Sequence, residues 1–319
     1  MEDGSIALSY QIVKQKKVHK IWGRIKRHRL IYFMLLPSFC FVIMFSYLPV
    51  WGIIIAFYDY KPAFGIAGST FVGLKHFQRF FNDSNFWILI RNTIAISFLR
   101  MILLTVFPIG FAVLLNELRA VKFKKFVQTV SYLPHFISFV VVATIAQTAF
   151  ATGGPVNSIL MSLGIISQPI IFFTVPKAFW WLVSGVNLWK GLGWSAIIYI
   201  SAIVSIDPAL YEAAMVDGAG RLKRIWHITI KGITPTVVVL LILEIPELLK
   251  AGFDASYLLG NSMVADFSEV LDTYVYRMGL QSGQFSYSTA IGLFTQIISL
   301  ILIFSANAVA KKHSEYSLF

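Results

Sequence analysis

The sequence is 319 residues long, with 57% hydrophobic residues, 13% charged residues and a formal net charge of +12. Soluble domains are nearer half apolar and a quarter charged, so this composition excludes an ordinary soluble protein and favours one whose solvent is a lipid bilayer. The apolar runs are much longer than the roughly 10-residue strands of a membrane barrel and suit helices of about 20 residues. We therefore predict an all-α, polytopic membrane protein.

Six apolar stretches predict six transmembrane helices. In chain order they cover residues 31–57, 86–115, 126–150, 179–204, 233–253 and 287–310. They define a membrane domain over residues 31–310, preceded by a basic tail of residues 1–30 and followed by a tail of residues 311–319. No small-residue cleavage site follows the first apolar stretch, so we expect it to remain a span and not to be a removed signal peptide.

Lysine and arginine are concentrated on one side of the six predicted spans. Most of the 27 lie in the N-tail, in the loops after spans two and four, and in the C-tail, whereas the other side carries Lys61, Lys75, Arg79, Lys177 and Arg277. Because loops rich in these residues stay in the cytoplasm, we expect both termini to be cytoplasmic. This topology accounts for most of the net charge, so nucleic acid is not an expected partner.

The outer loop after span one predicts a short amphipathic helix over residues 73–82. Leu74, Phe77 and Phe81 recur at helical spacing, while polar residues point elsewhere. Such a helix would lie in the outer membrane interface. The alternative is a helix packed on the outer ends of the spans.

The cytoplasmic loop between spans four and five, residues 205–231, predicts two short helices joined at an elbow. Asp207 can cap a helix beginning at Pro208, because an N-cap side chain accepts a free N–H and proline has none to leave unpaired. Gly218 and Gly220 then end this helix, and a second amphipathic segment leads into span five. A well-defined helix exposed on the cytoplasmic side indicates a binding partner.

This loop resembles the cytoplasmic "EAA" loop of the permease subunits of ABC importers. The resemblance rests on Glu212-Ala-Ala, on Gly218 six residues later, and on Ile228 ten residues further on. It implies that the first helix docks on a separate ATPase, with small alanines allowing close approach and the glycine allowing the sharp elbow. The coupling residues that it implies are Glu212, Ala213, Ala214, Asp217 and Gly218.

The sequence departs from this family in one place and lacks a nucleotide motif. Lys231 stands where the EAA loop usually has a proline, which leaves the exit of the second helix open. No Gly-x4-Gly-Lys-Ser/Thr phosphate loop occurs in the sequence. The resemblance therefore implies that ATP and Mg²⁺ are bound by the partner ATPase, that this chain holds no cofactor, and that it is not itself an enzyme.

Nearly the whole chain is similar to the maltose-type carbohydrate permeases, in particular to a branch that imports oligosaccharides derived from polysaccharides. The similar segments are residues 47–60, 68–73, 123–138, 189–194, 206–214 and 272–277. This resemblance implies a place in the bacterial cytoplasmic (inner) membrane. It also implies a complex with a second, different permease subunit, an ATPase dimer and an extracytoplasmic solute-binding protein. Substrate would move by alternating access through a cavity between the two permeases.

Charged side chains within span five are candidates for lining that cavity, because a charge at the bilayer centre costs roughly 2.5–3.5 kcal/mol on insertion scales. Glu244, Glu247 and Lys250 follow one another at three-residue spacing along one side of the helix. Pro246 between the acids favours a kink. The alternative is a Glu247–Lys250 pair buried against the partner permease.

Sugar recognition combines polar groups that bond hydroxyls with aromatic faces. The further candidates for the substrate pathway are Asn187, Trp189, Lys190, Trp194, Asp254, Tyr257, Asn261 and Tyr274, with Tyr276 beside them. Anchoring at the membrane interface is the alternative for the aromatic residues, and it is preferred for Trp180 and Trp181. Arg91 and Arg100 in span two are expected to contact lipid headgroups or neighbouring helices.

Three alternatives to a saccharide importer differ in how well the sequence supports them. One is an ABC permease for a solute other than a sugar, and another is a stand-alone, ion-driven transporter that uses Glu244 and Glu247. The latter needs no exposed docking helix, and six spans would be few for it. A membrane-embedded enzyme has no nucleophile–base pair to support it, and one cysteine with six scattered histidines suggests no metal site. The charge of the saccharide stays open, because the two acids disfavour an anion whereas Lys190 and Lys250 favour one.

Overall fold

The computed structural model describes residues 27–313, and the chain forms two compact units divided between Ile55 and Ala56. The first unit contains α2 (Arg29–Val42), η1 (Ile43–Tyr47) and most of η2 (Leu48–Phe57). Together they form one helical stretch, Arg29–Phe57, that is long and apolar enough to cross a membrane. It covers the first predicted span. The predicted N-tail lies almost wholly outside the described residues.

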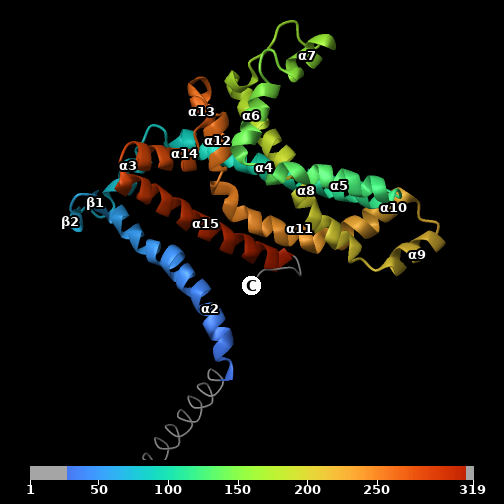
Figure 1. Cartoon of the computed structure of the whole chain (residues 1–319), viewed down its shortest axis with the longest axis horizontal. Helices are drawn as coiled ribbons and strands as arrows, with labels where there is room; N and C mark the ends of the chain where they lie inside the picture. The colour runs from blue at the N-terminus through green and yellow to red at the C-terminus, as the bar shows by residue number, and fades with distance from the viewer. Residues whose placement is uncertain (1–26, 314–319) are drawn as a thin grey trace, which may run out of the picture. The chain divides into compact units, whose positions relative to one another are not determined.

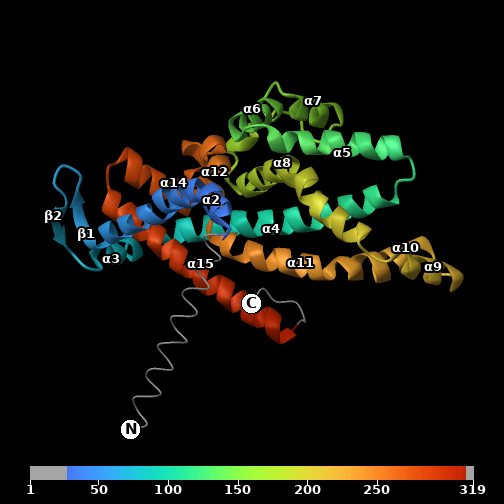
Figure 2. The ribbon, with the colours of Figure 1, turned by 60° about the horizontal axis from the view of Figure 1, so that its bottom comes forward.

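The second unit consists mainly of long helices that run lengthwise from one end toward the other (Figures 1 and 2). At the hairpin end, the antiparallel strands β1 (Tyr58–Lys61) and β2 (Gly65–Phe71) lie beside α3 (Lys75–Phe81). At the elbow end lie α9 (Pro208–Val216) and α10 (Arg221–Arg224). The lengthwise helices are α4 (Phe86–Glu117), α8 (Pro176–Val204), α11 (Lys231–Glu244) and α15 (Phe285–His313).

The number of spans agrees with the sequence when bent helices are counted as single spans. Four stretches within residues 27–313 could each cross a bilayer, and two bent helix pairs bring the number to six. The second and sixth predicted spans correspond to α4 and α15. The fourth corresponds to α8, which bends by 66° into α9.

The third predicted span, residues 126–150, is wrong as a single straight helix. The structure has α5 (Val121–Phe136) and α6 (Phe139–Ala149), which meet at 106°. Pro134 has no N–H to donate to the carbonyl one turn earlier, which weakens the end of α5. Ile137 then has an extended backbone. The Ser138 hydroxyl starts α6 by accepting the Val141 N–H at 3.5 Å. The chain therefore leaves one helix and caps the next within two residues.

Residues 233–249 of the fifth predicted span are part of a longer continuous helix, Arg221–Leu249, and the prediction of helix up to residue 253 overruns its end. It comprises α10, η4 (Ile225–Ile230), α11 and η5 (Ile245–Leu249). Lys231 lies inside this helix, so the lack of a proline there leaves the exit uninterrupted. At the other end the helix tightens around Pro246, as expected for a residue without an N–H. The Ser299 hydroxyl of α15 donates to the Pro246 carbonyl at 3.0 Å.

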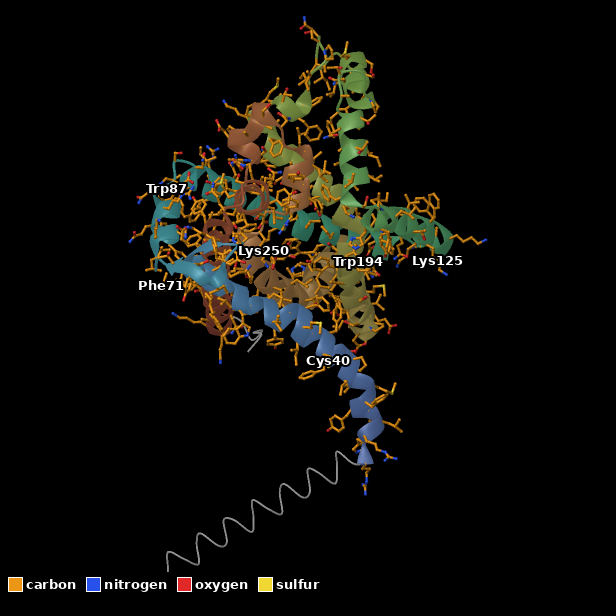
Figure 3. The ribbon with its side chains drawn as sticks, turned by 60° about the vertical axis from the view of Figure 1, so that its left-hand side comes forward. Cys40, Phe71, Trp87, Lys125, Trp194 and Lys250 are labelled. Carbon is orange, nitrogen blue, oxygen red and sulfur yellow. The ribbon has the colours of Figure 1, made fainter. Side chains whose placement is uncertain are left out.

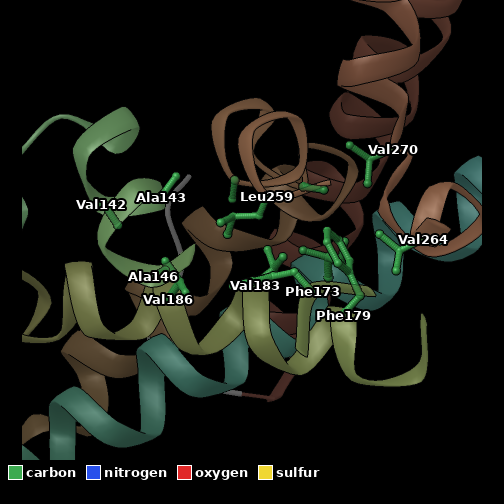
Figure 4. Packing of buried hydrophobic residues seen from close by; sticks show 13 residues of the cluster. Val142, Ala143, Ala146, Phe173, Phe179, Val183, Val186, Leu259, Val264 and Val270 are labelled. Atoms are coloured by element: carbon green, nitrogen blue, oxygen red, sulfur yellow. The ribbon is translucent and has the colours of Figure 1, made fainter. Parts of the chain in front are cut away.

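A buried apolar cluster joins α6 and α8 to the short elements after η5 (Figure 4). Val142 of α6, Phe179 and Val183 of α8 and Leu259 of α12 are almost wholly removed from solvent. Close packing of such side chains is what holds helices together in a membrane, so this cluster fixes the bent half of the unit. The short elements after η5 are α12 (Phe253–Leu259), η6 (Ser262–Val264), α13 (Ala265–Ser268), α14 (Leu271–Tyr276) and η7 (Arg277–Gln281), and two more, α7 (Pro155–Ser162) and η3 (Phe172–Thr174), lie between α6 and α8.

The helix predicted over residues 73–82 exists as α3, and one face of it packs on the long helices. Leu74 and Phe81 are exposed, whereas His76 and Phe80 are buried. Phe80 packs against aromatic rings of α4 and α15. Contacts with these two helices, which are distant in sequence, therefore decide which face of α3 is buried.

Candidate functional site

The helix expected at the elbow, α9, has the capping and the stop that the sequence predicts. The Asp207 carboxylate accepts the Ala209 N–H at 2.9 Å, and Pro208 occupies the first turn. The helix ends at Val216, and Gly218 follows with φ +73°. Only glycine adopts this left-handed backbone freely, so the sharp turn depends on that residue.

The α9 helix has no buried residue. Leu210 and Met215 are about half exposed and Val216 is 88% exposed. Of the predicted coupling residues, Glu212, Ala213, Asp217 and Gly218 are exposed and Ala214 is half-buried. An apolar helical surface in water is costly, so α9 presents a surface suited to a partner.

Two links hold the elbow against the long helices. The Tyr211 hydroxyl of α9 and the hydroxyl of Thr229, which is buried in η4, are 3.0 Å apart. The Arg221 guanidinium pairs with the Glu117 carboxylate at the end of α4 and donates to the Glu117 carbonyl at 3.2 Å. The first contact joins α9 to η4, which continues into α11, and the second joins α10 to the end of α4.

Trp194 and Glu244, predicted from different spans, line the same cavity. It has a volume of about 240 Å³ and lies between α4, α8 and α11, with Thr105, Ser195 and Tyr199 as further polar lining. Trp194 stacks one face on the His135 ring, with centroids 4.3 Å apart, and remains 45% exposed. Figure 3 shows Trp194 and Lys250 between Trp87 of α4 and Lys125 of α5. Hydroxyl acceptors beside an aromatic face are what a sugar ring requires.

Lys190, also predicted in the pathway, is held by the end of α5. Its ammonium donates to the carbonyls of His135 and Ile137 at 2.6 and 2.8 Å, and to that of Pro134 at 3.4 Å. The close approach of α8 to α5 depends on Gly193, where a Cβ would lie 2.2 Å from a carbonyl oxygen. Carbonyls at a helix C-terminus attract a cation, so Lys190 stabilises the break between α5 and α6.

Replacing Lys190 with methionine is expected to lower the melting temperature of the solubilised protein. The change leaves three carbonyls without their charged donor, and hydrogen bonds to charged groups contribute about 1.5–3 kcal/mol. Thermal unfolding in detergent measures the effect, with exposed Lys177→Met as the matched control. An equal melting temperature for Lys190→Met and the wild type would show that the cation does not hold the break.

The other candidates of span four do not join this cavity. The Asn187 amide donates to the carbonyl of Val183 in its own helix at 2.9 Å. Trp189 lines a separate, apolar hollow of about 380 Å³ between α6 and α8, together with Trp181 and Phe150. Within the described residues, these two side chains therefore face different surroundings from Trp194.

Glu247 and Lys250 form an ion pair of 3.0 Å, and both side chains are about two-fifths exposed. Burial raises the pKa of the nearby Asp272 carboxyl above its ordinary value, and the cations of Lys250 and Arg100 offset part of that rise. The region after α11 therefore brings charges from α4, η5 and α14 together.

Tyr257 and Asn261 meet in a polar hollow of about 250 Å³ formed by the segments from α12 to η7. Its lining also includes Tyr276, Glu269 and Arg277, and the last two form an ion pair of 2.6 Å. The Asn261 amide donates to the Phe173 carbonyl at 2.9 Å. Asp254, on α12, is exposed and is not part of this lining.

Tyr274 is buried, and its hydroxyl donates to the Asp83 carboxylate at 2.5 Å. The same carboxylate accepts the Tyr287 hydroxyl at 2.7 Å, and its other oxygen accepts the Asn85 N–H at 2.9 Å. Burial alone would raise the pKa of Asp83, but these hydrogen bonds outweigh it and hold that pKa below its ordinary value. The Asp83 cluster joins the α3–α4 turn to α14 and α15. No local sequence signal pointed to it.

Comparison with known proteins identifies the family. Residues 105–314, which include the elbow and most of the lining of the three hollows, match the family described as "Binding-protein-dependent transport system inner membrane component". The chain belongs to this family. It is therefore a permease component of an inner-membrane transport system.

Similar proteins cover nearly all of this permease. It is 43% identical over 314 residues to a polygalacturonan/rhamnogalacturonan transport system permease of Bacillus subtilis, covering 98% of this chain and 97% of that one. It is 40% identical to the LplB protein of the same organism, with 92% of each chain covered. A solved bacterial transporter that imports the acidic polysaccharide alginate has a chain with a TM-score of 0.84 and 36% identity, matching 93% of this chain and all of that one. The same transporter has been solved with a periplasmic protein carrying an alginate pentasaccharide.

Proposed function

We propose that this permease imports an oligosaccharide, a breakdown product of a polysaccharide, by alternating access driven by a separate ATPase. The observation that carries the proposal is α9, a capped helix without a buried residue whose Tyr211 contacts the long helix Arg221–Leu249. Relatives with 36–43% identity handle polysaccharides or the oligosaccharides made from them, according to their names. This supports a saccharide over another solute.

In this proposal the elbow end and both termini face the cytoplasm, and the hairpin end faces outward. The elbow end carries Arg221, Lys223 and Arg224, and the α4–α5 turn near it carries Arg119. Clustered cations favour the cytoplasmic side of a membrane. The hairpin end then meets the solute-binding protein.

The working complex contains a second permease, an ATPase dimer and an extracytoplasmic solute-binding protein. ATP and Mg²⁺ belong to the ATPase, because the sequence of this chain has no phosphate loop. Closure of the ATPase dimer moves α9, and the links from Tyr211 and Arg221 carry that motion into α11 and α4. The cavity that holds Trp194 and Glu244 lies between these helices, so its shape changes with ATP.

The docking role of α9 is tested by copurification. Glu212 is exposed and forms no hydrogen bond or ion pair through its side chain within the described residues, so Glu212→Lys is expected to leave the fold intact and to reverse a charge in the interface. The ATPase recovered with the solubilised variant should fall well below that of the wild type. Asp59→Lys, an equal charge reversal at the hairpin end, is the matched control. Equal recovery of ATPase with Glu212→Lys and the wild type would refute docking through this side chain.

A further inference from the structure

Arg100 lies deep within the longest membrane-spanning helix. It comes 14 residues after the start of the 32-residue α4, which is about 21 Å along a helix that rises 1.5 Å per residue. The hydrocarbon core of a bilayer is about 30 Å thick, so the guanidinium is far from the headgroups on either side. Of the two expected contacts, with lipid headgroups or with neighbouring helices, this depth favours one within the protein.

Among residues 27–313, the Arg100 guanidinium makes no hydrogen bond and no ion pair. Arg91, two and a half turns earlier in α4, shows the contrast. Its guanidinium donates to the Asp266 carbonyl at 2.5 Å and lies 4.8 Å from the centroid of the Phe267 ring. A charge at the bilayer centre is retained when it meets a partner or a cavity. Within the described chain Asp272 is near enough to interact with Arg100 electrostatically, but no acceptor occupies the guanidinium's N–H donors.

The surroundings of Arg100 leave its donors accessible. The side chain is only partly buried, and its Nη1 atom lies 3.4 Å from where a Cβ on Gly252 would be, so the absence of a side chain there leaves room for the guanidinium. The Asp272 carboxyl is near enough to both Arg100 and Lys250 to interact electrostatically with each. Leu104, one turn further along the same face of α4, lines the cavity that holds Trp194 and Glu244.

We propose that Arg100 binds a carboxylate of the transported saccharide, so that the permease is specific for oligosaccharides containing uronic acids. This inference rests on the proposed import of an oligosaccharide and adds its charge. A guanidinium presents a planar fork that matches a carboxylate with two parallel hydrogen bonds. The two positive charges of Arg100 and Lys250 balance the two negative charges of Glu247 and Asp272. An entering carboxylate is therefore not repelled by a net negative charge, and the N–H donors of the Arg100 guanidinium are free to bind it.

The test compares two probes in vesicles containing the complete complex and its binding protein, with ATP supplied. The probes are trigalacturonate and its trimethyl ester, which differ in charge but not in ring structure or linkage. The measured quantity is the ratio of their uptake rates. Because the same binding protein serves every variant, its own selectivity cancels when variants are compared with the wild type.

Arg100→Gln is expected to lower the ratio of acid to ester uptake about tenfold, the change that corresponds to losing one charge-assisted contact. Arg100→Lys, which keeps the charge but not the fork, should lower it less. Lys177→Gln removes an equal charge from an exposed position at the start of α8 and should leave it unchanged.

Three results would overturn the inference. One is a ratio that Arg100→Gln and Arg100→Lys leave at the wild-type value. Another is loss of the second permease from the purified Arg100→Gln complex, which would assign the side chain to the subunit interface. Uptake of neither probe by the wild type would overturn both this inference and the import of such oligosaccharides, whereas uptake of the ester alone would overturn only the inference.

Discussion

Replacing Gly218 with valine is expected to reduce ATP-driven uptake about tenfold or more while leaving the permease in the membrane. Gly218 has φ +73° at the end of α9. The left-handed region costs an L-residue roughly 1–2 kcal/mol, and a β-branched side chain fits it worst. The chain relieves this strain by turning differently, which moves α9 away from the position set by Tyr211 and Arg221.

Gly220 supplies the matched control for this prediction. It has φ −65°, and a Cβ at either glycine would meet open space. Gly220→Ala is therefore expected to transport normally, since it changes neither backbone geometry nor contacts. Gly218→Asn should retain more activity than valine, because asparagine tolerates the left-handed region. If Gly218→Val transported as well as Gly220→Ala, the backbone of the elbow would not matter for coupling.

Replacing Asp83 with alanine is expected to have the largest effect on stability. The buried hydroxyls of Tyr274 and Tyr287 would lose their acceptor, and each buried polar group left unpaired costs about 1–3 kcal/mol. A chain of this size loses about 2–4 °C of melting temperature for each kcal/mol. Thermal unfolding of the purified protein in detergent measures the change, and Tyr274→Phe should lose less because it removes one hydrogen bond and leaves Asp83 in place.

The same carboxylate predicts a pH dependence. Since the folded state lowers the pKa of Asp83 below its ordinary value of 3.8, the ionised form stabilises the fold at higher pH. That contribution is complete above about pH 5 and is lost as the pH falls through the folded pKa. The difference in melting temperature between the wild type and Asp83→Ala should therefore shrink below pH 4, while exposed Asp59→Ala should match the wild type throughout. A difference that stayed constant down to pH 3 would contradict the role of the charge.

The elbow could be predicted from sequence because its determinants are local. Asp207 caps the residues that follow it, Pro208 starts the helix, and Gly218 permits a backbone that other residues avoid. Each of these signals acts within a few residues, so a single sequence contains all of them. The structure reproduces the two helices and the turn between them.

The features that sequence alone could not predict depend on contacts between distant segments. From sequence alone, Lys190 resembles a charge in the substrate pathway. In the structure it binds carbonyls at the C-terminal end of α5, from residues that are 53 to 56 positions away in the chain. Likewise, Tyr274 resembles a sugar-binding aromatic residue in the sequence. In the structure its hydroxyl donates a hydrogen bond to Asp83, which is 191 residues away in the chain. For the same reason the burial of His76 and Phe80 in α3 could not be predicted. By contrast, Trp194 and Glu244 were proposed separately, and tertiary structure brings them to one cavity.

The central claim is that a separate ATPase drives this permease, and it is tested most directly by the energy source of uptake. The complete complex would be placed in vesicles with its loaded binding protein outside, and saccharide uptake measured with ATP inside or with a proton or sodium gradient alone. Uptake should require internal ATP and persist when ionophores collapse both gradients. Uptake driven by a gradient without ATP, and abolished by Glu244→Gln, would contradict the account and identify an ion-coupled transporter.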